Sequence, residues 1–161
     1  MELEIVRNKA IELMNSHGLR NWGFKFDLAK RRFGCCDYRN RTITLSKHLV
    51  LLNSPERVIN TILHEIAHAL TPGHHHDDVW RRKAIEIGCT GERCYSSKNT
   101  VVVEGKYVAH CSSCYHKHYR FRNPKYSVSC GNCSGGTYNE NYKLVFVQNK
   151  EMSGNLLGLT V

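Results

Sequence analysis

The sequence predicts an α+β protein in which a larger N-terminal domain precedes a small cysteine-rich module. Residues 2–17, 55–70 and 77–87 carry apolar residues at helical spacing. Short stretches within residues 19–45 alternate apolar and polar residues, as strands do. Two Cys-x-x-Cys pairs follow within residues 111–133. We therefore expect helices beside a small antiparallel sheet, followed by a module built around a metal ion.

The limits of the N-terminal helix and strands can be predicted from the residues that end helices and form turns. The first helix is expected to end at Gly18, because glycine commonly follows the last helical turn. Strands are predicted at residues 19–28, 33–38 and 42–45, separated by basic and asparagine-containing turns. Residues 49–52 are expected to form a short apolar link into the next helix.

Length and composition favour one sizeable core with a small appendage. The chain has 161 residues, of which 41% are hydrophobic. We expect domains at residues 1–95 and 96–148, followed by a tail at 149–161. No run is long enough to span a bilayer and no secretory leader is visible. We therefore expect an intracellular monomer, cytoplasmic or associated with nucleoid or nucleus and not secreted, whose cysteines bind metal.

The charge balance favours an anionic partner. The formal net charge is +9, and only four of the fourteen acidic residues are aspartate. Nucleic acid, as single-stranded or duplex DNA, is the leading candidate for that partner. The alternative is a solvated basic surface without a specific partner.

The helix at residues 55–70 carries His64-Glu65-Ile-Ala-His68. Histidines four residues apart lie on one helix face, where they can hold Zn²⁺ while the glutamate reaches a metal-bound water. The alternative is an amphipathic helix with two solvent-facing histidines. On a helical wheel the pair lies opposite the apolar face, in line with Arg57 and Thr61. This placement argues against histidines that are merely packed in a core.

The helix has clear ends, which direct the search for a third ligand. Ser54 and Pro55 suit the N-cap and first helical position, and Pro72-Gly73 ends the helix. Catalytic zinc takes three protein ligands and keeps one open position. The candidates that follow at once are His74, His75 and His76.

His76 has a further sequence feature in its favour. If a second helix starts near Asp77, His76 precedes Trp80 by four residues, and Trp80, Ala84 and Ile87 form a buried stripe.

The stretch from His64 to Leu70, the Pro-Gly loop, and His76 followed by Trp80 together resemble the SprT-like family, which includes the Spartan proteases. In that family the third ligand is a histidine followed at the fourth position by Trp or Phe, which maps onto His76. The family's usual glycine after this histidine is Asp77 here. A metzincin-type spacing would choose His74 instead.

The resemblance implies a zincin-like fold for residues 1–95 and a zinc-dependent endopeptidase. His64, His68 and His76 would hold the catalytic zinc, and Glu65 would be the catalytic base, with water activation of the gluzincin or metzincin type. The implied substrates are proteins bound or crosslinked to DNA, as in DNA–protein crosslink repair, with DNA binding controlling access. The alternative function is a non-catalytic nucleic-acid-binding adaptor, and a weaker one is a metal hydrolase with other substrates.

In zinc peptidases of the zincin type, an edge strand beside the metal helix pairs with extended substrate. We expect residues 42–46 to form that edge.

The two Cys-x-x-Cys pairs predict a zinc ribbon with a filled, structural metal site. Its ligands would be Cys111, Cys114, Cys130 and Cys133. Metal binding would supply most of the folding free energy of so small a module. Strands are predicted around residues 101–103, 106–109, 119–122 and 142–147. Two unrelated disulfides are the alternative.

Between the two pairs, residues 115–126 interleave basic and aromatic side chains without one acid. Cations can meet phosphates while exposed rings stack on unpaired bases; alternatively the rings supply the core of the ribbon. The candidate nucleic-acid contacts are Lys117, Tyr119, Arg120, Arg122 and Lys125, together with Arg81 and Arg82 after the metal helix.

The remaining cysteines carry weaker signals. Cys35 and Cys36 are expected to be small, partly buried thiols. Cys89 and Cys94 form a looser potential metal pair.

Overall fold

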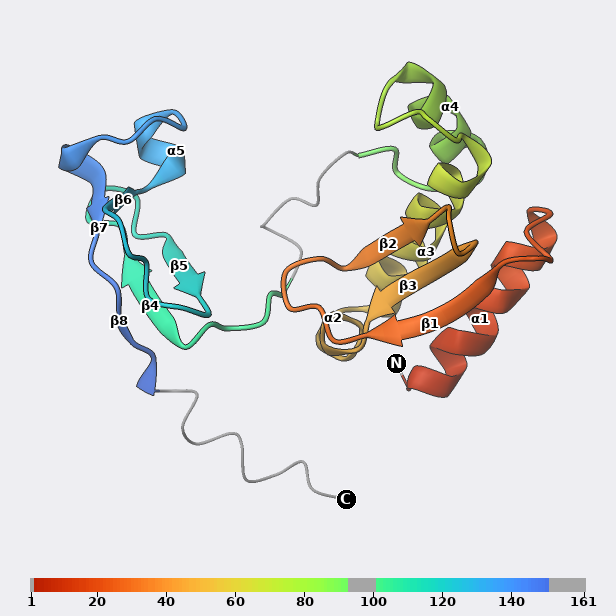
Figure 1. Cartoon of the computed structure of the whole chain (residues 1–161), viewed down its shortest axis with the longest axis horizontal. Coiled ribbons are helices and arrows are strands. Elements are labelled where there is room, and N and C mark those ends of the chain that lie inside the picture. The colour runs from red at the N-terminus through yellow and green to blue at the C-terminus, as the bar shows by residue number, and fades with distance from the viewer. Residues whose placement is uncertain (1, 93–100, 151–161) are drawn as a thin grey trace. The chain divides into compact units, whose positions relative to one another are not determined.

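The computed structural model describes residues 2–92 and 101–150 and divides into two compact units after Val103 (Figure 1). This division lies later than the boundary expected after residue 95. The reason is a pair of hydrogen bonds in the first unit: the Asn53 side chain accepts from the Val101 amide at 2.8 Å and donates to its carbonyl at 2.9 Å. Most of the expected tail, residues 151–161, lies outside the described residues.

The first unit contains four helices and three strands among its described residues. They are α1 (Leu3–Ser16), β1 (Gly23–Asp27), β2 (Gly34–Asp37), β3 (Thr42–Ser46), α2 (Lys47–Leu52), α3 (Pro55–Leu70) and α4 (Asp78–Glu86). The predicted α+β class is confirmed. The apolar link expected at residues 49–52 is part of the short helix α2, which the Ser46 hydroxyl caps by accepting from the Leu49 amide.

The sheet has the order β1-β3-β2. β1 pairs with β3 in parallel and β2 pairs with β3 in antiparallel fashion, so the sheet is mixed and not purely antiparallel as expected. β3 is central, and the prediction that residues 42–46 form the edge was therefore wrong. Ile43 and Leu45 of β3 are fully buried, which suits the middle of a covered sheet. Within the described residues, the free edges belong to β1 and β2.

The helix α3 is the centre of the first unit. It contacts β2 and β3, α1, and α4, and Figure 1 shows it crossing the sheet with α1 beside it. Its apolar residues Val58, Ile62 and Ile66 are fully buried in the main core. A second cluster joins α3 to α4 through Ala67, Trp80 and Ala84.

The second unit is small and consists of short elements. They are β4 (Tyr107–His110), β5 (Lys117–Arg120), β6 (Val128–Ser129), α5 (Gly131–Ser134), a 3₁₀ turn η1 (Glu140–Tyr142), β7 (Lys143–Leu144) and β8 (Val147–Gln148). One sheet has the order β5-β4-β8, and β6 pairs with β7.

The strand expected at residues 101–103 is absent, because Val101 bonds to a side chain of the first unit.

None of the helices in the described parts of the chain has both the length and the apolar character that a bilayer crossing requires.

We expect Ile62→Ala to lower the free energy of unfolding of the first unit by about 2–5 kcal/mol, because it leaves a cavity in a fully buried site. Both tryptophans lie in this unit, so urea unfolding followed by tryptophan fluorescence measures it selectively. Ile5→Ala is the matched control, since Ile5 is also helical but 55% exposed, and should change stability by no more than about 0.5 kcal/mol. Equal losses in the two variants would contradict this core.

Candidate metal centre and ribbon surface

Helix α3 positions the first two histidines. The Ser54 hydroxyl accepts from the Arg57 amide, and Pro55 occupies the first turn. Four residues apart on this helix, the His64 and His68 rings lie with centroids 5.0 Å from each other.

A strained turn positions the third histidine. His76 has a backbone φ of 61°, a left-handed conformation that costs a non-glycine residue about 1–2 kcal/mol. Asp77 follows it as the N-cap of α4, and its carboxylate accepts from the amides of Val79 and Trp80 at 3.0 Å. Asp77 itself has a φ of −80°, so this position does not require a glycine.

The three imidazoles converge. His76 Nε2 lies 3.0 Å from the Nε2 atoms of both His64 and His68, and the three donor atoms lie within 4.8 Å of one another. A tetrahedral zinc site with Zn–N bonds of 2.0–2.1 Å separates its donors by about 3.3 Å. The donor set therefore fits a metal ion. Of the other two candidates, His74 contacts Asp77 at 2.7 Å and His75 is exposed.

The surroundings keep His64 and His68 neutral. Burial, followed by the neighbouring histidines, lowers the pKa of His64 to about 3. Burial and His76 lower the pKa of His68 to about 4. Neutral imidazole is the form that binds metal. The sequence placed His64 opposite the apolar face of the helix. That side is covered here: His64 is only 7% exposed, because Trp80 packs on it with ring centroids 4.7 Å apart.

Glu65 is buried beside the histidines, with 6% exposure. Burial raises the pKa of its carboxyl to about 7, although the charge of Arg32 and the Cys36 amide oppose the change. Strand β2 approaches this carboxylate closely at Gly34, where a Cβ atom would lie 2.5 Å from Glu65 Oε1 and 2.7 Å from its Cγ. The sequence reasoning missed Gly34; a glycine inside a predicted strand was the available signal.

A pocket of about 300 Å³ opens onto the histidines. It is lined by Gly34, Cys35, Cys36, Tyr38, His64, Glu65, His68, His75 and His76. The Tyr38 hydroxyl donates to the His68 carbonyl at 2.5 Å and joins the end of β2 to α3. Cys35 and Cys36 are partly buried, and burial raises the pKa of the Cys36 thiol to about 12. Sequence reasoning did not identify Tyr38 as a neighbour of the metal centre.

The four ribbon cysteines form a second donor cluster. The Sγ atoms of Cys111 and Cys133 lie 3.7 Å apart, and those of Cys114 and Cys130 lie 3.6 Å apart. A tetrahedral zinc site with Zn–S bonds of 2.3 Å separates its sulfurs by about 3.8 Å, whereas a disulfide bond is about 2.05 Å long. The cluster therefore fits a metal ion held by four thiolates, as in a zinc ribbon.

Both Cys-x-x-Cys pairs form tight turns that aim their sulfurs inward. The Tyr115 amide donates to the Cys111 carbonyl, and the Ser134 amide donates to the Cys130 carbonyl, each at 2.9 Å. His118 Nε2 lies 3.3 Å from Cys130 Sγ.

Of the looser cysteine pair, Cys94 lies outside the described residues. The Cys89 thiol is buried and contacts the Asn60 carbonyl at 3.7 Å.

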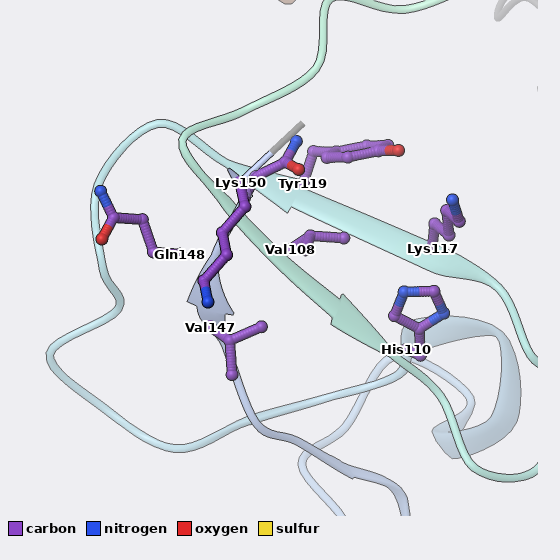
Figure 2. Close-up of a pocket in the computed structure, with 8 residues that line it drawn as sticks. Val108, His110, Lys117, Tyr119, Val147, Gln148 and Lys150 are labelled. Carbon is purple, nitrogen blue, oxygen red and sulfur yellow. The ribbon is translucent and has the colours of Figure 1, made fainter. Parts of the chain in front are cut away.

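The predicted nucleic-acid contacts are divided between the two units. Lys117 and Tyr119 of β5 line a groove of about 480 Å³ that also contains His110 and Lys150, and Figure 2 shows these side chains around β4, β5 and β8. Sequence reasoning missed His110 and Lys150, because the groove depends on strand pairing.

The other candidate cations lie elsewhere. Arg120 packs over the Phe146 ring at 5.6 Å, while Arg122 and Lys125 are exposed outside the groove lining. Arg81 and Arg82 are exposed on α4 of the first unit.

We expect His76→Ala to remove one metal equivalent per chain, because it deletes one of three converging donors. His74→Ala should retain the full metal content, since the His74 side chain is engaged with Asp77 instead. Metal analysis by mass spectrometry after gel filtration measures both. Loss of metal in the His74 variant with retention in the His76 variant would refute this donor set.

Comparisons with known proteins identify the family of the chain. Among solved structures, the crystal structure of the metallopeptidase zymogen jannalysin of Methanocaldococcus jannaschii aligns with a TM-score of 0.46 and 16% identity, covering 58% of this chain and 85% of that one. The search of curated proteins found no match. A model of the SprT-like family matches residues 8–102. Because this match spans more than half of the sequence, the chain belongs to the SprT-like family.

Proposed function

We propose that the protein is a zinc-dependent endopeptidase. The observation that carries the proposal is the convergence of three imidazoles beside a buried carboxylate, in a pocket open to solvent. His64, His68 and His76 would hold Zn²⁺, which when bound supplies Lewis acidity to the scissile carbonyl and to a water molecule. The ribbon cysteines would hold a second, structural zinc ion.

Glu65 is suited to carry the proton in this reaction. It would accept a proton from the attacking water and deliver it to the leaving amine. Burial raises the pKa of this carboxyl above its ordinary value, which favours uptake of the proton. Gly34 leaves the space that the carboxylate occupies.

Strand β2 is the element that suits an extended polypeptide substrate. It pairs with β3 on one side only within the described residues, and Gly34, Cys35 and Cys36 line the pocket. An extended chain can add to such an edge through main-chain hydrogen bonds. β2 thus takes the role that the sequence had suggested for residues 42–46.

We also propose DNA as a partner and DNA-bound or DNA-crosslinked proteins as substrates. The support is the net charge of +9, the family resemblance, and the ribbon groove in which Lys117 and Lys150 accompany the Tyr119 ring. Cations and an aromatic ring are the groups that bind a single strand through phosphates and an unpaired base.

We expect Glu65→Gln to retain all bound zinc yet to lower the kcat for hydrolysis of β-casein about 10²–10⁴-fold, because the amide cannot accept the proton. Glu56→Gln is the matched control, since Glu56 lies exposed in the first turn of the same helix and should hydrolyse casein at the parent rate.

The assay is run with single-stranded DNA, with duplex DNA and without DNA. Equal rates for the Glu65 variant and its parent would remove Glu65 from the mechanism. Tight DNA binding without hydrolysis in any of the three conditions would instead favour a non-catalytic adaptor.

We expect the Lys117→Ala/Lys150→Ala double variant to bind a single-stranded oligonucleotide more weakly than the parent does. The slope of log K against log salt should fall by about 1.4 if each lysine contacts one phosphate. Fluorescence anisotropy at four salt concentrations measures both quantities. Lys25→Ala/Lys47→Ala is the matched control, because these lysines are exposed on the first unit. An identical slope in the control and groove variants would exclude the groove as the contact surface.

A further inference from the structure

The three consecutive histidines after α3 have different surroundings. His74 Nδ1 contacts the Asp77 carboxylate at 2.7 Å, and His76 Nε2 lies among the metal donors. His75 is exposed and lines the same pocket as Glu65. Within residues 2–92 and 101–150, the His75 side chain has no hydrogen-bond partner.

His75 also lies close to the metal donors. It precedes His76 in the chain and lines one pocket together with His68. The backbone around it is fixed on both sides, by the contact of His74 with Asp77 and by the left-handed turn at His76. The imidazole therefore reaches the pocket from an anchored segment.

Peptide hydrolysis in this pocket would develop negative charge on the carbonyl oxygen, which a hydrogen-bond donor can stabilise in addition to the proposed zinc ion. The water oxygen bonds to the carbonyl carbon, and the carbonyl π pair becomes a lone pair on a negatively charged oxygen. The proton lost by the water passes through Glu65 to the amine nitrogen. The C–N bond then breaks towards that nitrogen, and the oxyanion pair re-forms the carbonyl. A hydrogen-bond donor aimed at the oxyanion lowers the barrier.

Few side chains that line the pocket can supply this donor. The hydroxyl of Tyr38 already donates to the His68 carbonyl. The ring Nε2 atoms of the three converging histidines face one another, and the thiols of Cys35 and Cys36 are weak donors. His75 is the remaining nitrogen donor among the lining side chains.

We propose that His75 is a catalytic residue whose ring N–H stabilises the oxyanion formed during peptide hydrolysis. This inference rests on the proposed endopeptidase function. This role of His75 differs from that of His76, which lies among the metal donors, and from that of His74, which contacts the N-cap residue Asp77.

The test starts from steady-state hydrolysis of β-casein and of the peptide within it that is cut fastest. His75→Ala should lower kcat about 10²–10³-fold, the usual loss for one oxyanion donor, with KM and zinc content unchanged. His75→Gln should recover part of kcat, because its amide also donates. His17→Ala, a histidine change in the first unit outside the pocket lining, should hydrolyse the peptide at close to the parent rate.

A second measurement does not depend on turnover. A phosphinic analogue of the same peptide imitates the tetrahedral oxyanion, and its dissociation constant should rise about 10²–10³-fold in His75→Ala. The unmodified peptide should bind Glu65→Gln and Glu65→Gln/His75→Ala equally well, because the ground-state carbonyl carries little charge.

The outcomes separate the two proposals. Full kcat and unchanged analogue binding in His75→Ala, with Glu65→Gln inactive, would overturn the role of His75 and leave the endopeptidase intact. A loss of kcat in Tyr38→Phe but not in His75→Ala would reassign the donor to Tyr38. Loss of zinc from His75→Ala would make it a structural or metal-binding residue. Absence of hydrolysis by the parent protein would overturn both proposals together.

Discussion

Trp80 is the side chain on which the geometry of the histidine cluster depends. It is 1% exposed, and its ring centroid lies 4.7, 5.1 and 4.5 Å from those of His64, His68 and His76, respectively. One indole thus contacts all three candidate ligands, from two segments of the chain. Burial of this ring stabilises the packing of α4 on α3. The same packing holds the histidine donors in place. The left-handed turn at His76 persists because the cap at Asp77 and this packing hold it on both sides.

The opposite wall of the pocket is strand β2, which is joined to α3 at two points. Gly34 lies against the Glu65 carboxylate, and the Tyr38 hydroxyl reaches the last turn of the helix at His68. The strand is therefore placed by the same helix that carries the donors. A polypeptide that pairs with β2 would consequently meet the carboxylate and the histidines in a fixed register.

Local signals made part of this structure predictable. Helix α3 is specified by residues close in sequence, namely the N-cap at Ser54 and the breaker at Pro72-Gly73. The tight turns at the two Cys-x-x-Cys pairs are specified in the same way, by their spacing. The central place of β3, the burial of His64 and the attachment of Val101 to Asn53 depend on contacts between distant segments. Alternation alone cannot separate a central strand from an edge strand, and a helical wheel does not show that another helix will cover a polar face.

Within residues 2–92 and 101–150 one side of β2 is unpaired, and this bears on how the molecule behaves at high concentration. A strand that can accept a foreign backbone can equally accept the same strand of a second molecule, which is the first step of ordered self-association. Here the exposed ladder is only four residues long and carries a glycine at one end and an aspartate at the other. Shortness, weak intrinsic β-propensity and a terminal charge each disfavour growth of such a stack. The edge can thus pair briefly with an extended polypeptide, but it offers too little surface for a fibre to nucleate.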